Sequence, residues 1–364
     1  MNTRLDVIIL GGGPAGTSAA ITLARAGLRV AVLERSRYEQ MRVGETIPPE
    51  TRIELQALGV WEMFQRAEHV ISSGNISVWG SDLPVENDFI FNPYGCGWHI
   101  DRRRFDEMLA CEAEALGVGI YRAMRVVSLV RQPKKLWTVR AERDGERHQF
   151  EAPYLIDASG RQSLIAVHNR IRKIIYDRLI GVMVFFKSKD GAEISDCRTL
   201  VEATELGWWY SAQLPQSGLV VALMTDPDLL PSKANMSSHW ENQLQRAPLT
   251  QSRLEFYTPK APVRVVSAAS YAWQQISGED WVSVGEAAAA FDPLSSGGII
   301  FALESGKRSA ELAIDFAKCG KVVADGYHLW VKKTFEKFLQ SRSHYYGMER
   351  RWVDSSFWLR RFQT

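Results

Sequence analysis

The chain contains 364 residues, of which 46% are hydrophobic and 24% charged, with 27 Gly and 14 Pro. This composition is that of an ordinary globular protein and excludes extended disorder and collagen-like repeats. The 44 Lys and Arg nearly balance the 42 Asp and Glu, for a net charge of +2, and no basic stripe predicts a nucleic-acid partner. The length allows one large domain or two smaller ones around a buried cofactor.

No apolar run reaches the roughly 18 residues that a membrane span needs. The N-terminal apolar run Val7–Leu10 is too short for the core of a signal peptide. The four cysteines are far apart, form no CxxC pair and have no His at metal-ligand spacing. We therefore expect reduced thiols in a cytoplasmic protein without a metal site.

The first part of the chain predicts a strand–helix–strand unit. Residues 6–10 form an apolar, β-branched run typical of a buried strand, and residues 17–26 are Ala-rich with helical periodicity up to Gly27. Residues 29–33 predict a second strand, which ends at Glu34. Such a unit begins a layered α/β fold.

A Gly-rich turn connects this first strand to the helix and reads Gly11-Gly12-Gly13-Pro14-Ala15-Gly16. Gly11 permits the tight turn, Gly13 allows a pyrophosphate to approach the backbone, and Gly16 allows close helix–strand packing. The helix N-terminus offers unpaired N–H groups to phosphates. Glu34, with Arg35 beside it, ends the second strand where a carboxylate can accept ribose hydroxyls. We therefore predict a nucleotide site.

Helices and strands alternate in the following part of the chain. Residues 41–49 form a loop punctuated by Gly and Pro, and an amphipathic helix over 101–115 begins at a capping Asp101. The other elements expected here are a helix over 50–67 interrupted near Gly59 and strands near 76–79, 88–91, 119–129, 137–142 and 149–156.

Residues 178–260 have a different pattern, with alternating, aromatic-rich segments around one polar helical stretch. This pattern predicts an antiparallel sheet inserted into an α/β protein. The expected strands are 180–186, 207–214, 219–225 and 253–258, and the expected helix covers 235–247.

A second turn of similar design follows this insertion. The apolar strand 281–285 leads through Gly285 and Glu286 into 292–298, a Pro/Gly turn that opens a helix near residue 299. Such a turn directs backbone N–H groups and the positive end of the helix dipole at one edge of a ligand. A reduced flavin needs such a partner because negative charge gathers near its N1/C2=O edge. Glu286 would reach the ribityl hydroxyls.

On these motifs the chain resembles the FAD-dependent monooxygenases of the p-hydroxybenzoate-hydroxylase fold, a superfamily that includes flavin-dependent halogenases and geranylgeranyl reductases. The segments that carry the resemblance are Gly11–Gly16 with Glu34, Gly44-Glu45-Thr46-Ile47-Pro48-Pro49, Asp101–Asp106, Asp157-Ala158-Ser159-Gly160-Arg161 and Gly285–Gly298. The implied architecture is a Rossmann-like FAD-binding domain (1–72, 98–178 and 262–320), an inserted antiparallel-sheet substrate domain (73–97 and 179–261) and a helical C-terminal segment (321–364).

The resemblance also implies contacts to FAD. Arg102 would contact the phosphates or the ribityl chain, and Asp157 and Gly160 would lie beside the pyrophosphate. The loop Arg42–Pro49 would cover the flavin. The residues that would line its ring are Pro293, Gly297 and Gly298. The family usually has Asp at the position of Glu286, so we expect flavin binding that is not necessarily tight.

Two features weigh against a halogenase. Tryptophan halogenases of this superfamily hold hypohalous acid on a Lys near the substrate, whereas this chain has no Lys between Met1 and Gln132. Their Trp-x-Trp-x-Ile-Pro motif has only a distorted counterpart at 208–215. Segments 79–81, 97–101 and 207–215 instead resemble flavoproteins that mature quinone cofactors from Trp side chains in lysine ε-oxidase-like and glycine oxidase-like enzymes.

Few candidate residues lie outside the FAD motifs. Trp208 and Tyr210 share one side of a predicted strand and would line a substrate pocket over the flavin, although sheet core explains them equally well. His99, Glu45 and Tyr210 are weak catalytic candidates, and a structural role explains His99 and Glu45 better. The aromatic and Arg-rich run at 345–362 predicts a helix packed on the body with its Arg side chains in solvent. A surface that docks a partner protein is the alternative.

The sequence therefore predicts an FAD-dependent monooxygenase that hydroxylates an aromatic, indole- or phenol-like group, with reduced FAD taking up O2 as a C4a-hydroperoxide. Electrons would come from NAD(P)H or from reduced flavin supplied by a reductase. The alternative is a maturation flavoprotein that hydroxylates a peptidyl Trp of a partner oxidase to build a tryptophylquinone cofactor. A C=C reductase, a halogenase and a flavin-binding protein without turnover are further alternatives.

Overall fold

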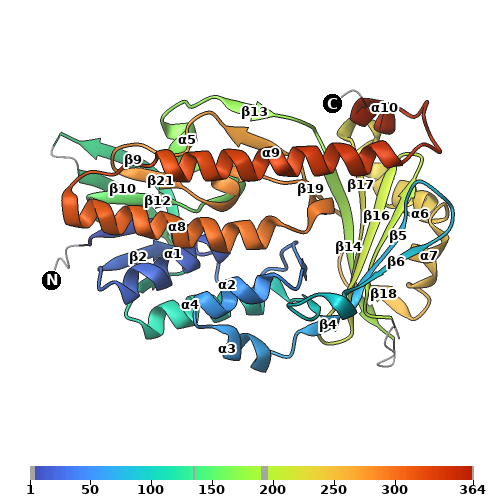
Figure 1. Ribbon diagram of the computed structural model, residues 1–364, viewed down its shortest axis with the longest axis horizontal. Coiled ribbons are helices and arrows are strands. Elements are labelled where there is room, and N and C mark those ends of the chain that lie inside the picture. Colours follow the sequence, from blue (N-terminus) through green and yellow to red (C-terminus); the bar gives the residue numbers. More distant parts are fainter. Residues whose placement is uncertain (1–4, 134–135, 190–195, 363–364) are drawn as a thin grey trace.

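The computed structural model describes residues 5–133, 136–189 and 196–362. Its first body is built on a parallel sheet in the order β21-β12-β1-β2-β8 (Figure 1). The strands are β1 Val7–Leu10, β2 Val30–Leu33, β8 Gly119–Tyr121, β12 Tyr154–Asp157 and β21 Trp281–Ser283. β1 and β2 are continuous apolar runs because a parallel sheet is covered on both faces.

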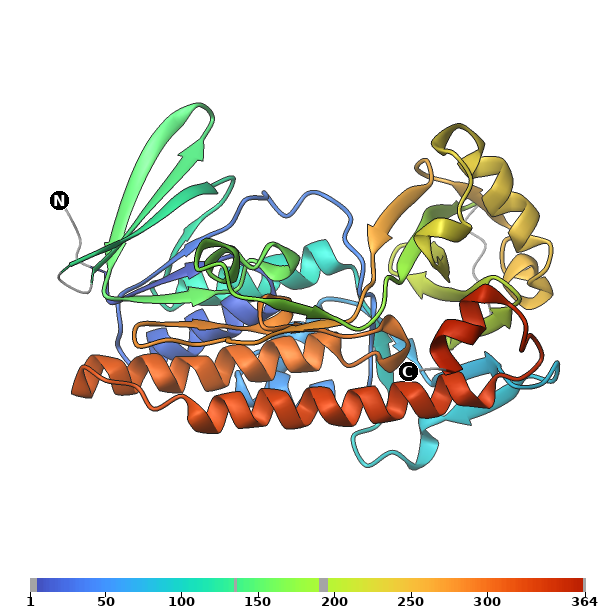
Figure 2. The ribbon, with the colours of Figure 1, turned by 90° about the horizontal axis from the view of Figure 1, so that it is seen from above.

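The two faces of this sheet have different covers. Val7 and Ile9 of β1 pack with helices, namely α1 (Pro14–Arg25), α4 (Arg102–Ala115) and α8 (Gly298–Cys319). Ile8 and Leu10 point the other way and pack with Trp137 and Val139 of an antiparallel meander. Figure 2 shows the ribbon of this meander on one side of the parallel sheet. The strands of this meander are β9 Arg125–Gln132, β10 Leu136–Arg143 and β11 Glu146–Ala152. The alternation follows from the two-residue period of a strand.

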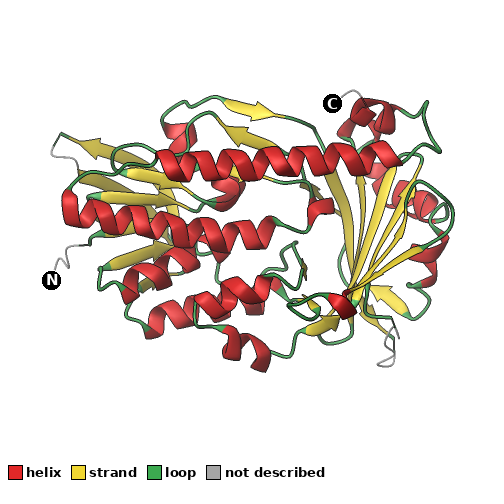
Figure 3. Cartoon of the chain, in the orientation of Figure 1, coloured by secondary structure: helices red, strands yellow, loops and turns green. Residues whose placement is uncertain are grey.

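The second body is a larger sheet, on the right of Figure 3, in the order β18-β14-β17-β16-β15-β5-β6, with β19 also paired to β14. All described pairs are antiparallel except β15 with β5, which run parallel. Its strands are β5 Gly74–Val78, β6 Val85–Asp88, β14 Ile180–Ser188, β15 Thr199–Thr204, β16 Gly207–Leu214, β17 Gly218–Thr225, β18 Tyr257–Pro259 and β19 Arg264–Ser267. The insertion predicted from the sequence is therefore present as a sheet that also takes in residues 74–88.

Adjacent tryptophans of β16 lie on opposite faces of this sheet. Trp209 packs with Trp240 of α6 (Met236–Leu244), which together with α7 (Pro248–Ser252) covers the outer face. Trp208 lies on the inner face, which turns toward the first body. The strand predicted over 253–258 is wrong for its first part, because α7 and the turn after it precede a strand that begins only at Tyr257.

Two C-terminal helices connect the bodies. α9 (Asp325–Met348) runs beside α8 and continues onto the second sheet, where α10 (Ser356–Phe362) lies on the inner face (Figures 1 and 2). Phe357 and Trp358 are fully buried, so the packed-helix interpretation of this segment is confirmed. The expectation that the Arg side chains point into solvent is wrong for Arg361, which is 3% exposed and paired with Asp226 at 2.8 Å.

The remaining elements complete the connections. Gly59, at φ +61°, separates two helices and confirms the predicted interruption. The elements are α2 Thr51–Ala57, α3 Trp61–Arg66, α5 Leu164–His168, β3 Thr46–Ile47, β4 Val70–Ser72, β7 Gly97–His99, β13 Lys173–Ile175, β20 Tyr271–Trp273 and β22 Ala289–Ala290. β3 and β7 pair, and this pairing places the 41–49 loop between the two bodies.

Candidate functional site

The glycines of the first turn have distinct steric surroundings. A Cβ on Gly11, at φ +109°, would lie 2.3 Å from the Ala158 carbonyl oxygen, and one on Gly16 would lie 2.0 Å from the Gly11 oxygen. A Cβ on Gly13 would meet nothing within 4 Å, and the N-terminus of α1 has no side-chain cap. The turn is thus closed where protein packs against protein, and open where a phosphate would meet free N–H groups.

The Glu34 carboxylate is buried at the end of β2. Oε2 accepts the Gly12 N–H at 2.8 Å, and Oε1 accepts both the Ser36 N–H at 2.8 Å and the Arg42 guanidinium at 2.9 Å. Burial acts to raise the pKa of Glu34, but these hydrogen bonds and the Arg42 charge outweigh it, so the pKa lies below its usual value. Arg35, predicted beside it, is exposed.

Arg42 and Arg102 meet at one carboxylate that the sequence reasoning did not single out. Asp106 is 0% exposed and accepts from Arg102 Nε at 3.0 Å and from Arg42 Nη1 at 3.2 Å. Arg102 also donates to the Val43 carbonyl at 2.6 Å. The available signal was the spacing of Arg102 and Asp106, which places them on one face of α4.

The second half of the predicted site converges on the first. Asp157 is buried, and its carboxylate accepts the Ser159 N–H at 3.0 Å and the Ile165 N–H at 2.7 Å, so it fixes the turn after β12. A Cβ on Gly160, at φ +64°, would lie 3.9 Å from Glu286 Oε2. One on Gly285 would lie 3.0 Å from the Cβ of Ala15.

The flavin-ring motif forms the loop before α8. The Asp292 carboxylate accepts the Leu294 N–H at 2.9 Å, and Pro293 begins a single 3-10 turn. Gly297 is the N-terminal cap of α8 without a side-chain cap bond, and a Cβ on Gly298 would meet nothing within 4 Å. As at α1, the helix begins with free N–H groups and open space.

A chain of polar side chains links the 41–49 loop to the second sheet. The Thr46 hydroxyl lies 2.7 Å from the Tyr210 hydroxyl and 3.3 Å from the Thr199 hydroxyl. Thr199 in turn lies 2.9 Å from His99 Nε2. Burial and the Arg253 charge lower the pKa of His99 to about 3, so its imidazole is neutral near pH 7.

Glu45, a predicted catalytic candidate, has a buried carboxylate close to the Tyr210 hydroxyl. It is 4% exposed; Oε2 accepts the Gly44 N–H at 3.1 Å, and the carboxylate also interacts with the Tyr210 hydroxyl. Burial raises the pKa of Glu45 to about 7, even though the Arg102 charge acts to lower it. A buried carboxyl with this pKa can both accept and return a proton near neutral pH.

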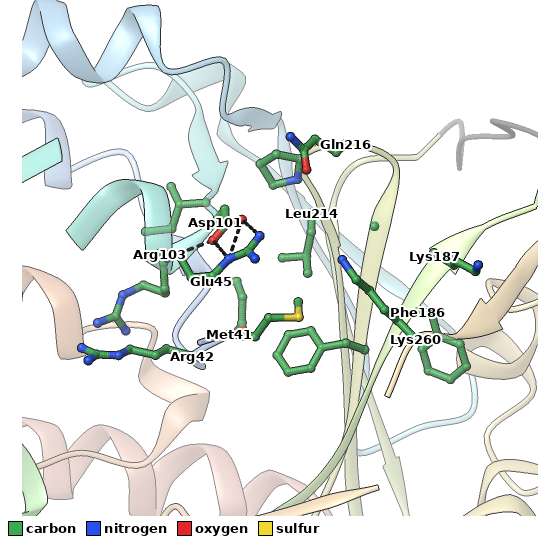
Figure 4. A pocket seen from close by; sticks show the side chains of 15 residues that line it. Met41, Arg42, Glu45, Asp101, Arg103, Phe186, Lys187, Leu214, Gln216 and Lys260 are labelled. Atoms are coloured by element: carbon green, nitrogen blue, oxygen red, sulfur yellow. Dashed lines mark hydrogen bonds and ion pairs between the residues drawn. The ribbon is translucent and has the colours of Figure 1, made fainter. Parts of the chain in front are cut away.

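The cavity beside Glu45 lies between the bodies, has a volume of about 50 Å³ and is partly open to solvent. Figure 4 shows Glu45, Asp101 and Arg103 on one side and Phe186, Lys187 and Lys260 on the other. Its remaining lining is Met41, Arg42, Ile100, Arg102, Phe185, Leu214, Pro215, Gln216 and Gly218. The lining thus combines apolar side chains with a cationic rim.

Trp208 and Tyr210, the predicted pocket residues, have different surroundings. Tyr210 is partly buried and bonds to Thr46 of the loop. Trp208 is 1% exposed, packs against Trp79 and donates from Nε1 to the Tyr346 hydroxyl at 2.9 Å. It does not line the cavity described above, and its contact with a substrate stays a prediction.

Over the described residues, no group of three or more His, Cys, Asp or Glu could hold a metal ion. The four cysteines form no disulfide, and three of them are exposed. Within the same part of the chain, no helix is both long and apolar enough to cross a membrane.

The parallel sheet, its Gly-rich turn and the second open helix N-terminus define a flavoprotein oxidoreductase. Residues 4–195 match the family model described as "FAD binding domain". LodB of Marinomonas mediterranea, which is named as an FAD-dependent oxidoreductase, is 30% identical over 365 residues, covering 98% of this chain and 96% of LodB. The chain belongs to this family of FAD-dependent oxidoreductases.

Halogenases are also relatives. Tryptophan 2-halogenase of Chondromyces crocatus is 25% identical over 82% of this chain and 59% of the halogenase. The structure of CmlS, a flavin-dependent halogenase, superposes with a TM-score of 0.85 at 27% identity, covering 99% of this chain and 68% of CmlS. QhpG, a peptidyl tryptophan dihydroxylase, superposes with a TM-score of 0.78 at 24% identity, covering 99% of this chain and 79% of QhpG, and this likeness shows the fold.

Proposed function

We propose that FAD lies along the path from the turn at Gly11–Gly16 to the loop at 292–298. The open space at Gly13 and at Gly298 supports this placement, because each lies at a helix start whose N–H groups have no side-chain cap. Arg42 and Arg102, held by Asp106, supply positive charge along the same path. Glu34 and Glu286 would accept hydroxyls of the ribose and the ribityl chain.

Gly13→Val tests this placement. The added side chain enters space that is empty in the protein, so the flavin-free variant is expected to fold with wild-type stability and to lose FAD binding. Tm and flavin content after denaturing release are the measurements. Wild-type flavin content in Gly13→Val refutes the placement.

We further propose that the chain is a monooxygenase that hydroxylates an aromatic group in the cavity beside Glu45. The observation that carries this proposal is a buried carboxyl, with its pKa raised to about 7, at a cavity of mixed polar and apolar lining between the two bodies. Reduced FAD, when bound, supplies the activation of O2. Met41, Phe185 and Leu214 would hold the ring and exclude water.

The polar groups of the site have distinct tasks in this proposal. The Glu45 carboxylate accepts the proton of the substrate's ring N–H or O–H, because loss of that proton raises the electron density of the ring that is attacked. Tyr210, bonded to Thr46, fixes the loop that carries Glu45. Neutral His99 hydrogen-bonds to the Thr199 hydroxyl. This bond orients the hydroxyls of Thr199 and Thr46 toward each other.

Turnover of the flavin-loaded protein with a donor and 18O2 tests the reaction type. Indole and phenol derivatives serve as substrates, and mass spectrometry of the products detects the label. One 18O atom per hydroxylated ring is expected. Products without label overturn the oxygenase proposal, and turnover that persists without O2 supports a C=C reductase instead.

A peptidyl Trp of a partner protein is the second candidate substrate. The cavity opens to the surface beside the exposed Gln216 and Lys260, so a side chain carried on a larger molecule can enter it. The name of QhpG describes this type of substrate for a protein of the same fold. Incubation with Trp-containing peptides and with free indoles separates the two candidates, since a maturation enzyme labels the peptides and leaves the free indoles unchanged.

The same assay tests halogenation. Because the chain has halogenase relatives, chloride or bromide is added to the reaction. The chain has no Lys from Met1 to Gln132, and Lys is the residue type on which the tryptophan halogenases hold hypohalous acid. We expect hydroxylated products at every halide concentration. Halogenated products in bromide overturn this expectation.

A further inference from the structure

A buried hydrogen-bond relay joins the second sheet to the loop that would line the flavin ring. Trp208 Nε1 donates to the Tyr346 hydroxyl at 2.9 Å, and that hydroxyl donates to Asp292 Oδ2 at 2.9 Å. All three residues are at most 1% exposed. The other oxygen of Asp292 accepts the Leu294 N–H, so the relay ends on the backbone of the loop.

The same strand also reaches the other predicted flavin loop. Two residues after Trp208, on the same face of β16, the Tyr210 hydroxyl meets Thr46 at 2.7 Å. β16 therefore holds both the 41–49 loop and the 292–298 loop. The latter contact is indirect and passes through a residue of the C-terminal helix α9.

Arg342, one turn earlier on α9, gives the relay its charge balance. Its guanidinium lies 3.2 Å from Asp177 and 3.5 Å from Asp292, and it is 6% exposed. Two buried carboxylates thus share one cation. The Tyr346 hydroxyl donates to Asp292 Oδ2 at 2.9 Å, which is shorter than the 3.5 Å contact of Arg342 with the same oxygen.

We propose that Tyr346 is a positioning residue for the flavin. Its hydroxyl fixes Asp292, and Asp292 fixes the direction of the N–H groups at Leu294 and at the start of α8. Without that donor, the buried Asp292 oxygen loses its short hydrogen bond and the loop shifts to recover one. This proposal rests on the placement of the flavin ring at the 292–298 loop.

Tyr346→Phe tests the proposal, and Tyr327→Phe is its matched control. Tyr327 also lies on α9, is 5% exposed, and donates to the Ser283 carbonyl at 2.8 Å, outside the loop. Both variants remove one buried phenol hydroxyl. We expect Tyr346→Phe alone to raise the Kd for FAD about tenfold and to shift the visible absorption of bound flavin.

The readouts are fluorescence titration of the flavin-free proteins with FAD, flavin spectra at saturation, and Tm. A purely structural hydroxyl would lower Tm in both variants and leave the FAD Kd and spectrum unchanged. Equal Kd values and spectra in Tyr346→Phe and wild type overturn the proposal. If Tyr346→Phe does not fold, Trp208→Phe removes the first donor of the relay and is expected to shift the flavin spectrum in the same direction; an unchanged spectrum there also overturns it.

The proposed placement of FAD and the proposed role of Tyr346 can be refuted independently. Wild-type flavin content in Gly13→Val refutes the placement. Loss of flavin in Gly13→Val together with wild-type binding in Tyr346→Phe refutes only the relay.

Discussion

Glu45→Gln should change how the stability of the flavin-free protein depends on pH. Burial raises the pKa of Glu45 from 4.5 to about 7 in the folded chain. The unfolded chain therefore loses this proton near pH 4.5, whereas the folded chain keeps it until about pH 7. The contribution of Glu45 to stability is fully present below pH 4.5 and is lost as the pH rises to about 7, and the total loss is about 3 kcal/mol.

The Gln variant has no proton to lose and should not show this decline. Urea unfolding of wild type and Glu45→Gln at half-unit steps from pH 4 to 8 measures the difference. The two proteins should be similar near pH 4, and the variant should gain about 3 kcal/mol over wild type by pH 8. Glu349→Gln is the control, because hydrogen bonds from Arg351 outweigh burial and lower the pKa of Glu349, so its difference from wild type should be flat above pH 5.

A constant difference between wild type and Glu45→Gln over this range refutes the raised pKa. The same carboxyl gives a kinetic expectation for the loaded enzyme. If Glu45 accepts the substrate proton, kcat/KM of wild type rises with pH through the pKa of Glu45, and Glu45→Gln loses that limb. A retained limb in the variant assigns it to another group.

Further expected outcomes concern the turn, a helix cap, a buried ion pair and the electron donor. Gly16→Ala should destabilise the flavin-free protein by about 2 kcal/mol or more in urea unfolding, because its Cβ would lie 2.0 Å from the Gly11 oxygen; wild-type stability contradicts this. Asp101→Ala should cost about 1 kcal/mol in the same assay, since the Asp101 side chain accepts the N–H of Arg103 at the start of α4. Arg361→Met should cost about 3 kcal/mol by removing the buried one of the two cations that pair with Asp226; a loss below about 1 kcal/mol in urea unfolding contradicts this and shows that Arg360 alone neutralises the carboxylate. Anaerobic mixing of the flavin-loaded protein with NADPH or NADH should bleach the flavin band if the protein takes hydride directly; an unchanged band assigns reduction to a separate reductase or to a bound partner.

The FAD motifs could be predicted because they are local. The turn at Gly11–Gly16 needs glycine wherever a backbone or a phosphate comes close, and that requirement is visible in six consecutive residues. The same holds for the cap at Asp101 and for the break at Gly59, where one residue sets the backbone. Strand β16 was also predicted with its observed bounds, because its alternation covers eight residues.

The rest of the site depends on contacts between distant segments. Asp106, which holds Arg42 and Arg102, had no signal beyond its helical spacing from Arg102. Trp208 donates a hydrogen bond to Tyr346, and these two residues are 138 positions apart in the sequence. The strand expected at 253–258 failed because its alternating residues pack as a helical turn and a short strand at the sheet edge.

The sequence by itself determined the class of cofactor, because binding phosphate and flavin requires particular residues at fixed spacing along the chain. Only the tertiary structure decided the burial of Glu45 and the contacts of the C-terminal helix α9. Folding raises the pKa of Glu45 by removing water from its carboxyl, and Tyr346 reaches Asp292 because α9 spans both bodies. Burial and contact between remote segments arise from the whole fold, so no local pattern could report them.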